Sequence, residues 1–151
     1  MSQAFRLILY LIAVHRIFPD RAAELYSYAV TVTAEEPPLF AGEYGRLKTL
    51  LLLIELAGRE SGGKKSAIGA AGDCGRLQLL YPPARKSHSC TEIQNSKDLD
   101  LRLGLSWMIE MRDFCGSVRK GLAAYARGKC GSEEGLKIAD FRMAEIEKAT
   151  P

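Results

Sequence analysis

The chain has 151 residues, 47% of them hydrophobic and 26% charged, a composition that excludes a disordered or collagen-like protein. Its length predicts a single domain over residues 1–151. The net charge of +3 suits an anionic polymer as partner, but no basic run is interleaved with aromatic residues, which argues against nucleic acid.

The first predicted element is a mostly buried helix over residues 2–18, which ends before Pro19. Its apolar run Leu7–Val14 is shorter than the roughly 18 residues of a membrane span, so we expect no stable membrane insertion. The run resembles a poor signal-peptide core without a cleavage site, so a buried helix is favoured over a secretion signal. Asp20 is expected to cap a second helix that runs to about Val30.

A connecting loop is predicted over Thr31–Gly45, which holds two prolines and two glycines. Leu47–Ala57 is apolar on every side, as in a helix at the centre of a domain, and this helix should end near Gly62. Three glycines at intervals of three then predict a loop or a small β-hairpin: Gly69, Gly72 and Gly75.

The rest of the chain is predicted to be helical after a polar, aperiodic segment, Ala84–Asp100. Three helices are marked by apolar residues at helical spacing: Leu101, Leu105, Met108 and Met111; Val118, Leu122 and Tyr125; and Leu136, Ala139, Met143 and Ile146. Gly128 can end the second of them. The predicted fold class is therefore mainly α.

The four cysteines are Cys74, Cys90, Cys115 and Cys130. Their spacing matches no zinc pattern, although His88 lies near Cys90, so we expect no metal and no other cofactor. The even number indicates two disulfides and an oxidising compartment, but four reduced thiols fit the same count, and four cysteines allow three pairings.

Glu60 is the residue of greatest chemical interest, because it follows a very apolar run at the end of the central helix. The negative end of the helix dipole disfavours a carboxylate there, and desolvation in a cleft would do the same. A carboxylic acid that stays protonated is what cleavage of a glycosidic bond needs, since the leaving oxygen must receive a proton. The alternative is a solvated glutamate at a helix end.

The stretch "ESGGKKSAIGAAGDCGRLQL" resembles the central motif of the soluble lytic transglycosylase family, which has the lysozyme-like fold. Gln78 follows Glu60 by 18 residues, which is the family's spacing, and Gly72 and Gly75 stand in the expected places. A second family signature is echoed by "AAYARG" at Ala123–Gly128.

The resemblance covers residues 47–128 and leaves a helical N-terminal part over residues 1–46. It implies that Glu60 is a single acid/base: it protonates the bond between N-acetylmuramic acid and N-acetylglucosamine, then deprotonates the muramyl 6-hydroxyl to give a 1,6-anhydro product. One carboxylate then suffices where ordinary glycosidases use two. The implied partner is the glycan strand of peptidoglycan, bound by a monomer.

The same resemblance implies roles for the neighbours of Glu60. Ser61 would hold the loop, Gln78 would line the sugar cleft together with the backbone of Gly72 and Gly75, and Tyr125 would place its hydroxyl near the carboxylate. The resemblance thus implies two catalytic residues, Glu60 and Tyr125, and four substrate-binding residues, Ser61, Gln78, Gly72 and Gly75.

The chain departs from the family pattern in ways that leave two alternatives open. Arg76 and Leu77 replace Leu-Met, Gly69 replaces a serine that contacts substrate, and Arg127 interrupts the tyrosine motif. One alternative is a hydrolytic muramidase similar to goose-type lysozyme, in which Asp73 activates water at roughly 6.5–9.5 Å from Glu60. The other is a non-catalytic wall-binding or virion-structural domain. A purely structural turn at Asp73 is favoured, because it follows a glycine.

The cysteines fit the same picture. A Cys115–Cys130 bridge would bracket the tyrosine helix and stabilise the chain by roughly 3 kcal/mol, and a Cys74–Cys90 bridge would pin the glycine loop. The "GDCGR" and "YARGKC" phrases resemble those of phage and prophage lytic proteins. We therefore expect action in the periplasm, the cell wall or outside the cell.

Overall fold

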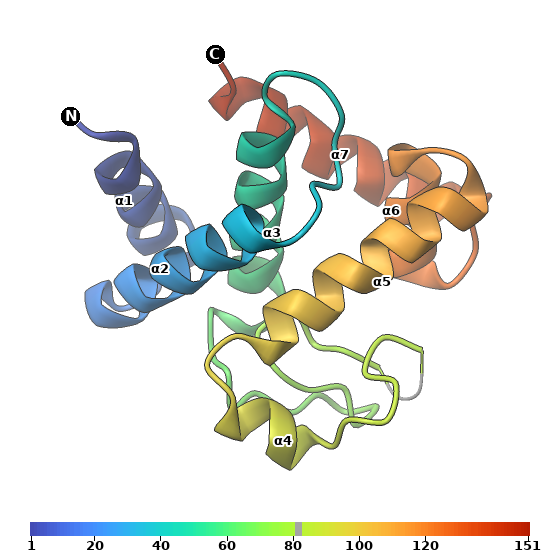
Figure 1. Cartoon of the computed structure of the whole chain (residues 1–151), viewed down its shortest axis with the longest axis horizontal. Coiled ribbons are helices and arrows are strands. Elements are labelled where there is room, and N and C mark those ends of the chain that lie inside the picture. The colour runs from blue at the N-terminus through green and yellow to red at the C-terminus, as the bar shows by residue number, and fades with distance from the viewer. Residues whose placement is uncertain (81–82) are drawn as a thin grey trace. The chain divides into compact units, whose positions relative to one another are not determined.

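A computed structural model describes residues 1–80 and 83–151 (Figure 1). In this part of the chain the structure is all-α, with no regular strand, which confirms the mainly helical prediction. Seven helices are seen there: α1 (Gln3–His15), α2 (Pro19–Glu35), α3 (Gly45–Ser61), α4 (Cys90–Asn95), α5 (Leu99–Cys115), α6 (Val118–Arg127) and α7 (Glu133–Ala149). None of them is long and apolar enough to cross a membrane.

The chain divides into two compact units. The first consists of Met1–Glu36 and Leu53–Gly104, and the second of Pro37–Leu52 and Leu105–Pro151. The first unit contains α1, α2, α4, the end of α3 and the start of α5. The second contains the start of α3, the rest of α5, α6 and α7. Glu60 belongs to the first unit and Tyr125 to the second.

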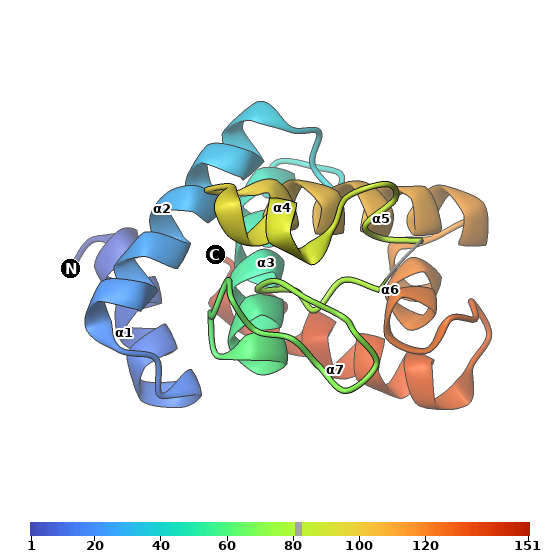
Figure 2. The same ribbon diagram turned by 90° about the horizontal axis from the view of Figure 1, so that it is seen from below.

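Helix α1 is less buried than predicted. The Ser2 hydroxyl accepts a hydrogen bond from the Phe5 N–H at its start, and Arg16 closes its end in the left-handed conformation. Leu7 and Leu11 are buried, whereas Phe5, Leu9 and Val14 are exposed. Only part of the apolar run therefore contributes to the core, because α1 buries a single face, which packs beside α2 (Figure 2).

Helix α2 corrects two predictions. Pro19 opens it, with Phe18 as the N-cap, so Asp20 lies in the first turn and is not the cap. The pyrrolidine ring presets the backbone for a first helical position, where the missing N–H is not needed. The helix also runs past Val30 to Glu35, into the predicted loop, because Val32 and Thr33 are buried. It ends where the proline at position 37 forces the preceding residue into an extended conformation.

Helix α3 is buried along its middle, residues 51–58, as predicted for a central helix. Its end is closed by the Gly62 N–H, which donates to the Gly58 carbonyl at 3.1 Å, and by the Gly63 N–H, which donates to the Ala57 carbonyl at 3.0 Å. Both glycines have positive φ, which other residues rarely adopt. The predicted stop near Gly62 is confirmed.

The glycine-rich segment after α3 is a loop. Two isolated antiparallel bridges, Ile68 with Cys74 and Cys74 with Leu79, take the place of a regular β-hairpin. The segment that follows contains a short helix that was not predicted, α4. Its signal is present in the sequence as a capping box, in which the Ser89 hydroxyl accepts from the Glu92 N–H and the Glu92 carboxylate accepts from the Ser89 N–H.

The two disulfides pair Cys74 with Cys90 and Cys115 with Cys130, with Cα atoms 5.8 and 5.5 Å apart. The expected sequential pairing is thereby confirmed. In the second unit the bridge brackets α6, which packs tightly on α7. A Cβ atom at Gly135 would lie 2.7 Å from the Ala123 carbonyl oxygen, so a glycine is needed for this approach.

Candidate functional site

Glu60 lies in the last turn of α3 and its side chain is exposed. The desolvation by burial that the sequence suggested is therefore not provided by the chain itself. Its neighbour Ser61 is half-buried, and the Ser61 hydroxyl lies 2.8 Å from the Arg76 carbonyl oxygen and 3.0 Å from that of Ala57. Ser61 thus ties the end of α3 to the glycine-rich loop.

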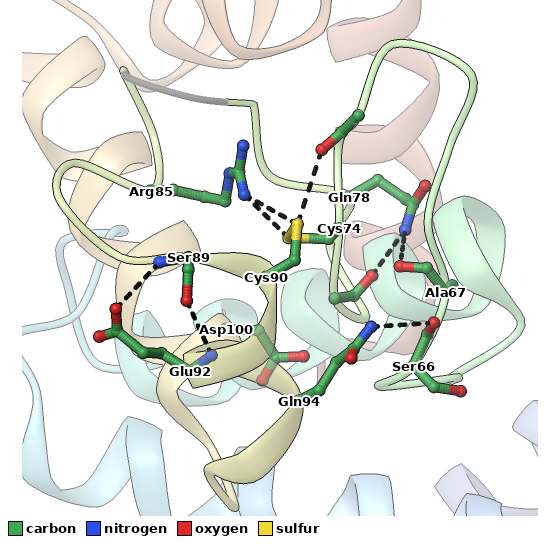
Figure 3. The surroundings of a disulfide bond; sticks show 12 residues. Ser66, Ala67, Cys74, Gln78, Arg85, Ser89, Cys90, Glu92, Gln94 and Asp100 are labelled. Atoms are coloured by element: carbon green, nitrogen blue, oxygen red, sulfur yellow. Dashed lines mark hydrogen bonds between the residues drawn. A yellow bond between two sulfur atoms is a disulfide. The ribbon is translucent and has the colours of Figure 1, made fainter.

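Gln78 is a fixed part of that loop. Its backbone has a φ of 49°, in the left-handed region that a non-glycine residue seldom adopts. The Nε2 atom donates hydrogen bonds to the Gly75 carbonyl at 2.9 Å and to the Ala67 carbonyl at 3.1 Å (Figure 3). The amide nitrogen is therefore engaged within the loop, and the side chain is held in one orientation.

Gly72 and Gly75, the two glycines expected to bind the sugar, are required for different structural reasons. Both have positive φ, 78° at Gly72 and 84° at Gly75. A Cβ atom at Gly75 would also lie 2.9 Å from the Cβ atom of Asp100, whereas one at Gly72 would meet open space. Gly75 is thus fixed by packing inside the unit, and Gly72 leaves the backbone open at the surface.

Asp73 folds back onto its own loop. A Cβ atom at Gly69 would lie 2.4 Å from both carboxylate oxygens of Asp73, and the Gly69 N–H donates to the Asp73 carbonyl at 2.8 Å. This arrangement supports a turn-forming role for Asp73. It also explains Gly69: the space that a serine would occupy is filled by the Asp73 carboxylate.

Arg76, which replaces an apolar residue of the family pattern, is part of the core. Its side chain is 1% exposed and pairs with Asp100, which is fully buried. The guanidinium also donates to the Lys97 carbonyl and lies 5.4 Å from the centre of the Tyr28 ring. Arg76 therefore holds the loop that carries Gln78. Asp100 was not identified from the sequence, because a lone aspartate at a helix start has no distinguishing pattern.

A second buried polar cluster surrounds Glu55 on α3. Its carboxylate accepts hydrogen bonds from the Tyr10 hydroxyl, from Nε of Arg59 and, at 3.0 Å, from Nε2 of His15. Burial by itself would raise the pKa of Glu55, but the hydrogen bonds from His15, Tyr10 and Arg59 outweigh it and lower this pKa to about 2. The cluster fastens α1 to α3, the helix that carries Glu60.

The packing of Gly58 belongs to the same cluster. A Cβ atom there would lie 2.5 Å from the His15 ring, so only glycine lets the ring approach. No local pattern indicates this contact, because His15 and Gly58 are 43 positions apart in the chain.

Tyr125 lies on α6 in the second unit and is half-buried beside the buried residues Leu122 and Ala124. Of the stripe predicted for this helix, Leu122 is in the core, whereas Val118 and Tyr125 are half-buried. The approach of the Tyr125 hydroxyl to Glu60 stays a prediction, because the two residues belong to different units.

Over residues 1–80 and 83–151, no three His, Cys, Asp or Glu side chains gather as a metal site would require. No protein-family model, no curated protein and no solved structure matches the chain.

Proposed function

We propose that the protein is a peptidoglycan lytic transglycosylase with a lysozyme-like fold, in which Glu60 is the acid and base. The observation that carries this proposal is the link through Ser61 between the end of α3 and the loop of Gln78. The exposed carboxylate of Glu60 and the glycine-rich loop therefore meet at the same end of α3, which supports the proposal.

In the proposed mechanism a glycan strand covers Glu60 and supplies the desolvation that the free chain lacks. The helix dipole then further favours the protonated acid. Glu60 donates its proton to the bridging oxygen between N-acetylmuramic acid and N-acetylglucosamine. The resulting carboxylate takes the proton of the muramyl 6-hydroxyl, whose oxygen attacks C1 and closes the 1,6-anhydro ring.

The loop residues would position the sugar. The open backbone at Gly72 allows close approach of a ring or an acetamido group. Because Nε2 of Gln78 donates within the loop, we assign the side-chain oxygen, Oε1, as the atom that accepts a hydrogen bond from the substrate. The proposed site of action is the periplasm, the cell wall or the exterior, to which the two disulfides add weak support.

Digestion of purified sacculi, followed by mass spectrometry of the released muropeptides, tests this proposal. We expect 1,6-anhydro ends from the wild type and none from Glu60→Gln. Glu133→Gln, which removes an exposed carboxylate from the start of α7, is the matched control and should keep full activity. Thermal unfolding should show all three proteins equally folded.

Each other product pattern contradicts the proposal in a different way. Reducing ends would indicate a hydrolytic muramidase, and their loss in Asp73→Asn would assign the water-activating role to Asp73. Intact sacculi that retain the bound protein would indicate a non-catalytic wall-binding domain. Anhydro products from Glu60→Gln would exclude Glu60 as the acid.

A further inference from the structure

The positively charged guanidinium of Arg85 contacts both sulfur atoms of the disulfide between Cys74 and Cys90. Nη1 of Arg85 lies 2.8 Å from Sγ of Cys90 and 3.5 Å from Sγ of Cys74 (Figure 3). The carbonyl oxygen of Gly72 lies 3.7 Å from Sγ of Cys90. The guanidinium therefore stands where negative charge would develop if this bond were reduced.

The two sulfur atoms differ in access. Cys74 is fully buried, whereas Cys90 is half-buried at the first position of α4. An incoming thiolate must approach along the S–S axis, so Cys90 is the accessible target and Cys74 is the leaving group. A nearby guanidinium stabilises a thiolate, and a better stabilised leaving thiolate departs faster.

The second disulfide provides an internal comparison. In the described residues, no cationic side chain donates a hydrogen bond to Sγ of Cys115 or Cys130, although the bridge closes a loop of nearly the same length, 15 against 16 residues. Loop length therefore does not distinguish the two bridges, and the contact with Arg85 does.

We infer that the Cys74–Cys90 bond is a thiol–disulfide exchange site, attacked at Cys90 by a dithiol reductant and assisted by Arg85. One thiolate of the reductant bonds to Sγ of Cys90, and the electron pair of the broken bond leaves on Sγ of Cys74. The second thiolate of the reductant then bonds to its first sulfur and releases Cys90. The reductant is oxidised to its disulfide, and the protein gains two electrons, with its thiolates taking up protons from water or remaining ionised.

This exchange acts on the segment between α3 and α5. Once the bond is open, α4 is held to the loop by weaker contacts, such as the hydrogen bond of 3.3 Å from Nε2 of Gln94 to the Ser66 carbonyl. The loss of the cross-link also removes a constraint on the unfolded chain. Reduction at this site would therefore loosen the segment between α3 and α5. This inference is independent of the proposed enzymatic activity.

Timed reduction of the native protein by dithiothreitol tests the site. The reaction is quenched by alkylation, and mass spectrometry measures the state of each cysteine. We expect Cys74–Cys90 to open at least about threefold faster than Cys115–Cys130, and Arg85→Gln to remove that advantage. Lys86→Gln removes one positive charge from the next residue. In this control, Cys74–Cys90 should still open faster than Cys115–Cys130.

A monothiol probe identifies the attacked sulfur. Brief exposure to glutathione should leave the mixed disulfide on Cys90 and not on Cys74. Adducts on Cys74, equal reduction rates for the two bridges, or an unchanged rate in Arg85→Gln would each overturn the inference. If Arg85→Gln does not fold, Arg85→Lys keeps the charge and should show a rate between that of the wild type and that of Cys115–Cys130.

Discussion

Oδ2 of Asp100 accepts two hydrogen bonds from Arg76, one from the backbone N–H at 2.8 Å and one from Nε at 3.0 Å. Both side chains are almost completely buried. The carboxylate therefore holds both the backbone and the guanidinium of Arg76 in place. Arg76 lies two residues before Gln78 in the same loop. This contact links the glycine-rich loop to the first turn of α5.

Asp100→Asn should destabilise the protein by about 3–5 kcal/mol, because it leaves the buried Arg76 cation without its counter-charge. Urea unfolding measures this loss. Asp140→Asn, which removes an exposed partner of Arg119, is the control and should change stability little. Replacing both buried partners, in Arg76→Met/Asp100→Leu, should lose less than the single change. If Asp100→Asn and Asp140→Asn lost the same amount of stability, the buried pair would not have the importance assigned to it.

The free energy of unfolding should decrease at acidic pH, because Glu55 becomes protonated there. Its pKa is about 2 in the folded protein and 4.5 without the surrounding structure, so the unfolded chain binds the proton first. The stabilisation is complete above pH 4.5 and is lost as the pH falls toward 2; its size is on the order of 3 kcal/mol. Urea unfolding between pH 2 and 7 should show this slope in the wild type.

The matched pair for this measurement is Glu55→Gln and Glu43→Gln, which change a buried and an exposed glutamate. The stability difference between Glu55→Gln and the wild type should shrink below pH 4.5, whereas Glu43→Gln should follow the wild-type curve. A constant difference at every pH would show that Glu55 does not supply the acid sensitivity.

Ser61→Ala should lower the turnover of sacculi by about tenfold, because the loop of Gln78 loses its tie to the end of α3. The loss of one hydrogen bond should cost only about 1 kcal/mol of stability. Ser61→Thr keeps the hydroxyl and should restore most of the turnover. This prediction depends on the proposed function; unchanged turnover in Ser61→Ala, with an active wild type, would remove the positioning role.

Gly121→Ala should destabilise the second unit by about 1–3 kcal/mol through overpacking. A Cβ atom at Gly121 would lie 2.6 Å from the backbone nitrogen of Arg112, and a backbone cannot yield as a side chain can. Gly131→Ala is the control, since its Cβ atom would meet open space. Thermal unfolding of both variants checks this, and equal melting temperatures would show that α5 and α6 can separate without loss.

The sequence determined most of the local structure of this protein. Helical spacing of apolar residues located α5, α6 and α7, and the glycines at positions 62 and 63 marked the end of α3. These signals are local, because the periodicity and the left-handed residues act within a few positions of each other. The extension of α2 past Val30 was missed, since burial of Val32 and Thr33 depends on a neighbour that the local sequence does not reveal.

Tertiary structure alone decided what the charged residues do. Arg76 looked like a departure that would spoil a cleft, yet it is buried against an aspartate 24 residues away. Glu55 looked like one polar residue in an apolar run, yet it joins three partners, two of them some 40 residues distant. A buried charge is tolerated only where partners converge on it, and that convergence is a property of the folded chain.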